Sequence, residues 1–180
     1  MILPYRSVPA WCHQGNPEDS FGLCAYAMLG NLMLIQGGDL MPDVEIESAA
    51  RAIEGFDEWI AATDTGVQLE VLFRYVQQNG WPGDPSRVIQ WSPASFDAIP
   101  SVIASRGGCA AALALPMGID GGYDFSDAAL ERGAPGVYGH AVALVEPGTF
   151  ITWGEPRQVS EAWMRAYGRG FYDVVWVEEV

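Results

Sequence analysis

A loop of turn-forming residues that runs directly into an apolar helical segment is the feature that most constrains this chain. Residues 14–23 are rich in Gly, Asn, Pro, Asp and Ser, which favour turns. Residues 24–36 are mostly apolar, and two glycines follow them as a helix stop signal. The pattern predicts a central helix whose first residue is Cys24.

Cys24 therefore occupies a position that can make a thiol reactive. The unpaired backbone N–H groups and the positive end of the helix dipole favour the thiolate and lower the pKa of a cysteine placed there. A cysteine in an apolar helix can equally be a small buried core residue. The sequence leaves both roles open.

One of the two histidines, His140, opens an apolar run far along the chain. Residues 140–145 and 149–153 predict two strands. A regular strand positions a side chain more precisely than the proline-interrupted arm that holds His13. His140 is therefore the preferred base for a nucleophilic thiol, and a hydrogen-bonded histidine at a strand edge is the alternative.

Composition and charge bound the class of protein. The chain has 180 residues, 49% of them hydrophobic, with seven Trp, which is enough for one domain with a sizeable core. Its net charge is −14, and its nine basic residues are all Arg. This balance argues against binding to nucleic acid or to an anionic membrane.

The cysteines Cys12, Cys24 and Cys109 form an odd set without a closely spaced pair, unlike a secreted disulfide scaffold. We therefore expect a cytoplasmic protein. The first residues lack the regions of a signal peptide, and no apolar run is long enough to cross a membrane. Cys12 and His13 lack the spacing of a zinc site, so we expect neither metal nor cofactor.

The remaining patterns predict a single α+β domain. Its mainly helical lobe covers about residues 1–106, and its mainly β lobe covers about residues 107–180. Residues 117–138 form a long, acidic, Gly-rich segment, which either rims a cleft or is a solvated insertion. Further helices are expected at 43–54, 67–78, 95–105 and 160–167, and further strands at 88–91, 109–115 and 171–177.

Attack of a thiolate on an amide also needs donors to the oxyanion. The backbone N–H of Cys24 is one such donor. The loop side chains Gln14 and Asn16 are the candidates for the second. Their alternative role is turn formation, to which Asn16 before Pro17 is well suited.

A third group normally orients the base. Thr152 is the candidate because Ile151 cannot accept a hydrogen bond, and Glu155 is a second acceptor close in sequence. Trp153 is expected to shield the imidazole from water, although core packing is the simpler account.

The pattern resembles the papain-like cysteine peptidases, and within them a small group of homologues encoded by bacteriophages and prophages. The likeness covers Gly15 to Glu179. In that group a Gly-Asn-Asp segment leads to Gly-Asp-Cys, which residues 15–24 match with two residues extra. Further matches are Asp64-Thr65-Gly66, Leu115-Pro116, Gly139-His140-Ala141-Val142, Thr152-Trp153-Gly154, Ala162-Trp163 and Tyr167.

The resemblance implies a papain-like fold, in which a central Cys-bearing helix packs against a C-terminal antiparallel sheet. It also implies Cys24 as nucleophile, His140 as base and Asn16 in place of the oxyanion glutamine. The implied activity is cleavage of an amide bond in a protein or peptide substrate. The implied location is the cytoplasm of a bacterial host, or the virion.

Two departures from the family weigh against full activity. Leu23 replaces the acidic residue that usually precedes the Cys, and Ile151 stands where the orienting Asn is usual. A Cys/His dyad can still work, because loss of an orienter reduces catalysis without abolishing it. The alternatives are a degenerate papain-like module that binds phage structural proteins in a particle or its assembly, and a domain whose Cys24 and His140 never meet.

Overall fold

The computed structural model describes residues 2, 4–7, 10–12, 23–54 and 67–178. The helices are α1 (Cys24–Ile35), α2 (Asp43–Glu54), α3 (Leu69–Asn79), α4 (Ile99–Arg106), α5 (Ala128–Glu131) and α6 (Glu161–Tyr167), with short 3-10 helices at Tyr5–Ser7 and Phe96–Ala98. The strands are β1 (Arg87–Ala94), β2 (Cys109–Pro116), β3 (Gly136–Glu146), β4 (Thr149–Thr152), β5 (Glu155–Gln158) and β6 (Gly168–Glu178). The predicted α+β class is confirmed.

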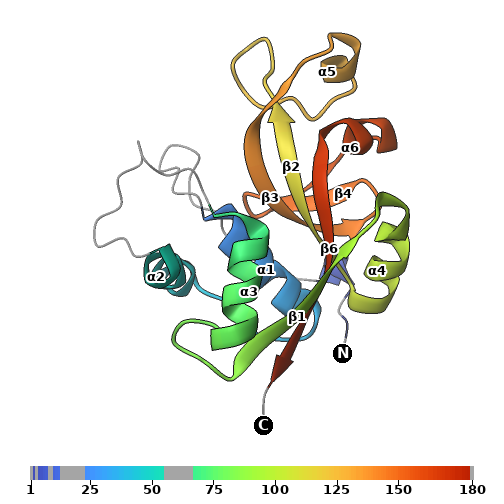
Figure 1. Ribbon diagram of the computed structural model, residues 1–180. Coiled ribbons are helices and arrows are strands. Elements are labelled where there is room, and N and C mark those ends of the chain that lie inside the picture. Colours follow the sequence, from blue (N-terminus) through green and yellow to red (C-terminus); the bar gives the residue numbers. More distant parts are fainter. Residues whose placement is uncertain (1, 3, 8–9, 13–22, 55–66, 179–180) are drawn as a thin grey trace.

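The six strands form one antiparallel sheet in the order β1-β6-β2-β3-β4-β5. Figure 1 shows α1 and α3 on one side of this sheet and α4 and α6 on the other. Because β6 pairs with both β1 and β2, it joins a strand of the first half of the chain to the hairpins of the second. The two predicted lobes therefore share a single sheet.

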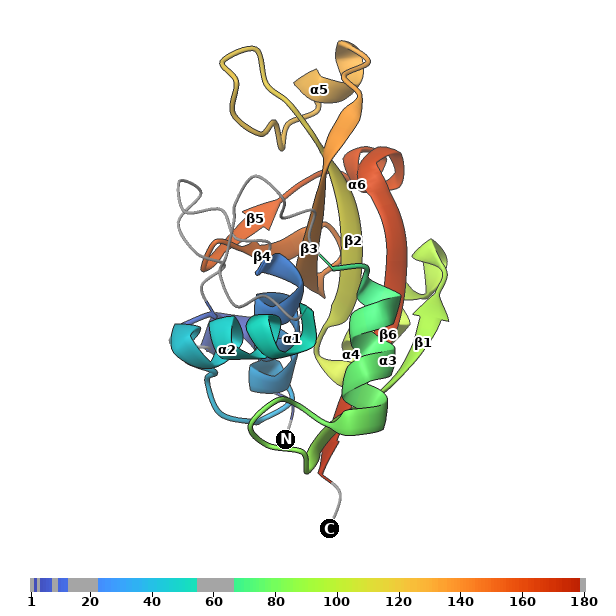
Figure 2. The same ribbon diagram turned by 60° about the vertical axis from the view of Figure 1, so that its left-hand side comes forward.

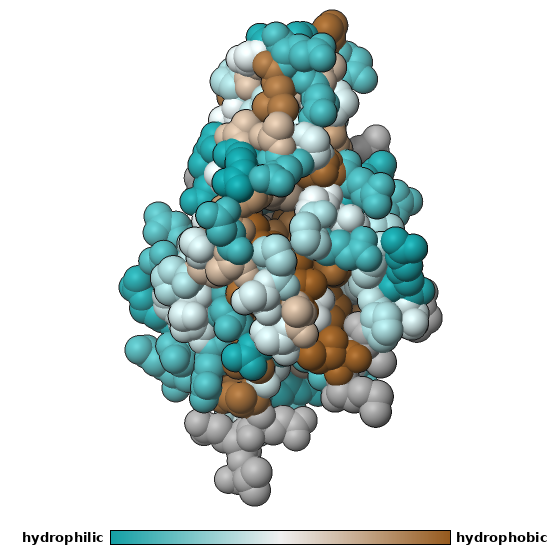
Figure 3. Space-filling view, turned by 90° about the vertical axis from the view of Figure 1, so that its right-hand side faces the viewer, coloured by the Kyte–Doolittle hydropathy of each residue, from teal (hydrophilic) through white to brown (hydrophobic). Residues whose placement is uncertain are grey.

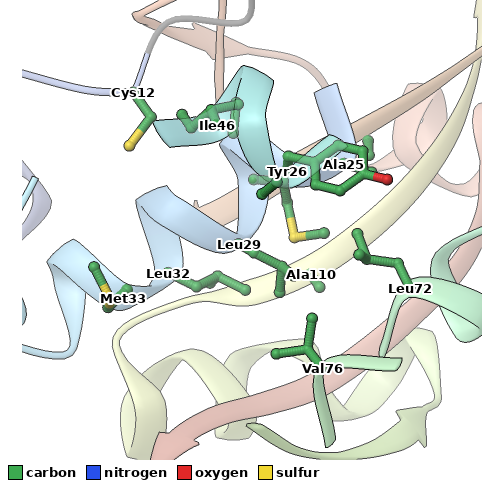
Figure 4. Close-up of a cluster of buried hydrophobic side chains, with 14 of the residues drawn as sticks. Cys12, Ala25, Tyr26, Leu29, Leu32, Met33, Ile46, Leu72, Val76 and Ala110 are labelled. Carbon is green, nitrogen blue, oxygen red and sulfur yellow. The ribbon is translucent and has the colours of Figure 1, made fainter. Parts of the chain in front are cut away.

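Helix α1 is enclosed on nearly every side. Eleven of its twelve residues are buried, and all but Asn31 among these eleven are apolar or glycine. A helix that is apolar all round belongs in the middle of a core. Figure 4 shows Leu29 and Leu32 of α1 in the same cluster as Ala110 of β2 and the α3 side chains Leu72 and Val76.

Side chains alternate strictly between the two faces of β3. Ala141 and Ala143 pack in the cluster that holds α1, whereas Val142 and Leu144 pack in the cluster that holds Trp163 of α6. Alternation is the normal geometry of a strand. It places His140 on the same face as Val142 and Leu144.

The sequence predicted the long helices more accurately than the β lobe. Residues 117–138 are not an uncommitted loop, because they contain α5 and the first residues of β3. Glycines at 136 and 139 weaken the strand pattern there, yet Tyr138 pairs with Leu115 in the ladder. Strand β5 was missed because all four of its residues are exposed and carry no apolar alternation.

The N-terminal arm is fastened to α1 at Gly30 and Asn31. The backbone N–H of Cys12 donates to Asn31 Oδ1 over 2.8 Å, and the Cys12 thiol donates to the carbonyl of Met41. A Cβ added at Gly30 would lie 2.7 Å from the Cys12 sulfur. Only glycine allows this approach of arm and helix.

Gly30→Ala should lower the free energy of unfolding by about 1–2 kcal/mol, because the overpacking outweighs the better helix propensity of alanine. In a Cys12→Ala background the same change should cost at least about 1 kcal/mol less, since the clashing sulfur is gone. Urea unfolding of the four proteins of this cycle measures the coupling. Gly122→Ala, whose new Cβ meets nothing nearer than 3.6 Å, is the control. If the effects of Gly30→Ala and Cys12→Ala on the free energy of unfolding were additive, the close contact between residue 30 and the Cys12 sulfur would be contradicted.

Candidate functional site

The packing of α1 along β3 brings Cys24 and His140 to the same end of the molecule. Ile35 at the end of α1 shares a buried cluster with Val145 near the end of β3. Cys24 lies eleven residues before Ile35, which is about 16 Å along a helix. His140 lies five residues before Val145, about 17 Å along a strand. Figure 2 shows that α1 and β3 run in the same sense.

His140 is held from the neighbouring strand by Thr152. Its Nε2 atom lies 2.6 Å from Thr152 Oγ1, and both side chains are buried. The register of β3 and β4 makes these residues diagonal neighbours on one face of the sheet. Because Thr152 engages Nε2, Nδ1 is the ring nitrogen that remains for a second partner.

Trp153 covers the imidazole from a strained turn. The indole stacks on the His140 ring with 4.9 Å between centroids and 18° between planes. Trp153 has φ 46° and Gly154 has φ 75°, as the two central residues between β4 and β5. This is the dihedral pattern of a tight hairpin turn. Among the described residues, Trp153 is the only non-glycine with positive φ, and such outliers cluster at functional sites.

Tyr123 extends the aromatic wall and connects it with Cys24. Its ring stacks on Trp153 at 5.4 Å and 7°, and it also contacts Tyr138 at 5.4 Å. Burial raises the pKa of the Tyr123 phenol, and interactions with Tyr138 and with Cys24 raise it further. The last effect requires Cys24 to lie near Tyr123.

Cys24 and Tyr123 belong to different apolar clusters. Cys24 is half-buried and packs against the α1 cluster, whereas Tyr123 packs against the α6 cluster. Strand β4 ends at Thr152, and among the described strands none pairs with that side of β3 at His140. Among the described strands, the β4 side of β3 is therefore an open strand edge at His140.

Burial shifts the pKa values of the histidine and of two cysteines away from their usual values. Burial lowers the pKa of His140 to about 4, so the imidazole is neutral at pH 7. Burial also raises the pKa of Cys12 to about 11 and that of Cys109 to about 12. These two thiols are structural, and Cys24 is the one that reaches a partly exposed position. None of the three, all within the described chain, is in a disulfide.

The structure sorts the other predicted site residues. Asn16 and its rival Gln14 lie outside the described residues. Glu155 is exposed and pairs with Arg157 at 3.1 Å, so it does not orient His140. Ile151 points to the opposite face, where it packs with Ile35 and Val145. Sequence reasoning missed Tyr123, because nothing local marks a tyrosine of the segment 117–138 for contact with Trp153.

The buried imidazole should make stability depend on pH. The unfolded chain takes up a proton at His140 near pH 6.5, whereas the folded chain does so only near pH 4. The unfolded state therefore binds more protons in this window, and stability falls as pH drops through it. His140→Gln should reduce the loss between about pH 7 and about pH 4.5 by about 2–3 kcal/mol. Urea unfolding of parent and variant at both pH values measures this, and equal losses would show that His140 is not desolvated.

The sequence matches no protein-family model and no curated protein. The geometry of Cys24, His140, Thr152 and Trp153 is therefore the basis for a functional conclusion.

Proposed function

We propose that the protein is a papain-like thiol hydrolase that cleaves an amide bond with Cys24 and His140. The observation that carries the proposal is the 2.6 Å contact between His140 Nε2 and Thr152 Oγ1 beneath a stacked indole. It supplies what a histidine base needs, namely a fixed ring, a nitrogen left for the nucleophile and exclusion of water. The helix N-terminus at Cys24 adds the activated thiol.

The reaction starts from a neutral pair, because burial of His140 opposes a resting imidazolium. The Cys24 sulfur attacks the amide carbon while Nδ1 of His140 takes the thiol proton. The carbonyl oxygen becomes an oxyanion beside the backbone N–H of Cys24, with Asn16 as the proposed second donor. The imidazolium gives its proton to the leaving amine as the C–N bond breaks. Water, deprotonated by His140, then hydrolyses the thioester and releases the thiol.

In this proposal Thr152 takes over the positioning role of the missing Asn, and Trp153 takes the role of shield. A hydroxyl offers one hydrogen bond to the ring and can rotate to suit either tautomer. The substrate is a protein or peptide. Its phage or host origin rests on the sequence resemblance alone, as does location in a bacterial host.

A second candidate function is a degenerate papain-like module that binds partners, such as phage structural proteins, without cleaving them. Ile151 favours it, because an apolar side chain stands where the family carries the orienting Asn and points into the core. In that case Cys24 would be a packing residue. The reactivity of Cys24 separates the two functions.

Iodoacetamide should alkylate Cys24 in the folded protein much faster than Cys12 or Cys109, whose thiols are buried and whose pKa values are high. At pH 7, His140→Gln should slow alkylation of Cys24 by about tenfold or more through loss of the base. Mass spectrometry of the peptides that contain each cysteine measures the three rates. His13→Gln, which changes the other histidine, is the matched control. An unreactive Cys24, or a rate independent of His140, would leave only the binding module.

Thr152→Val should slow Cys24 alkylation by about fivefold, because it removes one hydrogen bond worth about 1 kcal/mol while keeping the side-chain shape. Thr152→Ser keeps the hydroxyl and should restore most of the rate. If Thr152 had only a structural role, the two substitutions would change the alkylation rate of Cys24 equally, or neither would change it. The measurement is the pH dependence of the alkylation rate in the three proteins.

A further inference from the structure

The segment 117–139, called here the arm, projects beyond the body of the molecule. Figures 1 and 2 show it at the top, where the ends of β2 and β3 carry α5 away from the sheet. Trp163 Nε1 donates to the Asp124 carbonyl at 3.1 Å, and the Tyr167 hydroxyl donates to the Ala134 carbonyl at 2.9 Å. A bridge between Met117 and Tyr123 closes its first turn. Two hydrogen bonds therefore hold the arm to α6.

The arm presents apolar side chains to solvent. Four of the eight exposed large apolar residues in the described chain lie on it, and Ile119 is 89% exposed and Val137 63% exposed. The other two are Met117 and Tyr138. Figure 3 shows apolar side chains among hydrophilic ones on this projecting end. Ile119 lies in a pocket with Tyr123, and exposed apolar side chains held at a fixed position are typical of an interaction site.

The charge of the arm is one-sided. It carries four carboxylates and one Arg, a net charge of 1 − 4 = −3. The single Arg132 is already paired with Asp124 at 2.7 Å. Asp120 and Ile119 line one shallow pocket together with Tyr123. A ligand that fills this pocket meets the apolar Ile119, the carboxylate of Asp120 and the ring of Tyr123, beside the Arg132–Asp124 ion pair.

The arm is continuous with the candidate site. Tyr123 belongs to the pocket on the arm and also stacks on Trp153, the cover of His140. Tyr138 contacts Tyr123 and lies two residues before His140 on the same strand. A chain bound along the arm would therefore be led toward the imidazole.

We propose that the arm binds the substrate of Cys24, a protein segment in which Arg or Lys residues flank a large apolar side chain. This inference rests on the proposed function. The basic residues complement the carboxylates, and the apolar side chain covers Ile119, which lines the pocket with Tyr123. A second copy of the chain is disfavoured as the occupant, because two molecules of charge −14 repel each other.

The probe is a fluorescein-labelled peptide in which Leu and Tyr alternate with Arg. Two control peptides carry Glu in place of Arg, or Gly and Ser in place of Leu and Tyr. Cys24→Ala prevents turnover, and anisotropy titration measures binding. We expect the Arg peptide to bind and the two control peptides not to bind. The affinity for the Arg peptide should fall as ionic strength rises from about 0.01 M to about 0.15 M.

Ile119→Ser should weaken binding by about tenfold, through loss of exposed apolar contact area. Asp120→Asn with Glu131→Gln should weaken it by about fivefold and flatten the salt dependence. The control Leu40→Ser with Val44→Ser alters exposed apolar residues away from the arm and should leave binding unchanged. Equal binding of the Glu peptide, or arm-dependent dimerisation without peptide binding, would overturn the proposal.

The titration and the alkylation rate separate this inference from the proposed function. Arm-dependent binding of the Arg peptide by a protein with an unreactive Cys24 would keep the arm as a docking site and reject the hydrolase. A reactive Cys24 in a protein that binds none of the three peptides would keep the hydrolase and reject the docking arm.

Discussion

Complete burial of α1 is the constraint on which the rest of the structure depends. The helix can be enclosed because small residues lie on two sides of it. Gly30 faces Cys12 of the N-terminal segment, and alanines of β2 and β3 face the helix from the sheet. Burial of this apolar area supplies a large share of the folding free energy. It also leaves the first residue of the helix as the position from which a side chain can reach the surface, which is where Cys24 lies.

Burial also determines the environment of His140. Its ring is enclosed by the neighbouring strand, the Thr152 hydroxyl and the Trp153 indole, so the charged imidazolium is unfavourable there. A thiol beside such a ring would ionise as part of its reaction and not before it. The cover itself depends on Trp153, which holds a dihedral angle that L residues rarely adopt. Stacking of the Trp153 indole on His140 and on Tyr123 offsets this backbone strain.

The sequence predicted what depends on local pattern. Helix α1 was identified because turn-forming residues precede it and glycines follow it, and α6 because Gly168 closes the run from Ser160 to Tyr167. The structure adds that the Ser160 hydroxyl accepts the Trp163 N–H as the helix cap. Thr152 was a candidate partner of His140 because it is close in sequence to Trp153 and can accept a hydrogen bond, which Ile151 cannot. Tyr123, by contrast, reaches Trp153 across thirty residues of chain, and no periodicity encodes that contact. Burial of His140 likewise depends on which face of β3 the helices cover.

The place of β6 has a consequence for how the molecule is made. This strand is the last of the six described strands along the chain, yet it lies inside the sheet, between the edge strand β1 and β2. During synthesis β1 emerges before β6, which is its one partner among the described strands, and it stays without that partner until the other four described strands have been translated. The frame around Cys24 and His140 is therefore complete only after β6 has been translated, so a nascent chain that still lacks β6 would carry the thiol without the organised site.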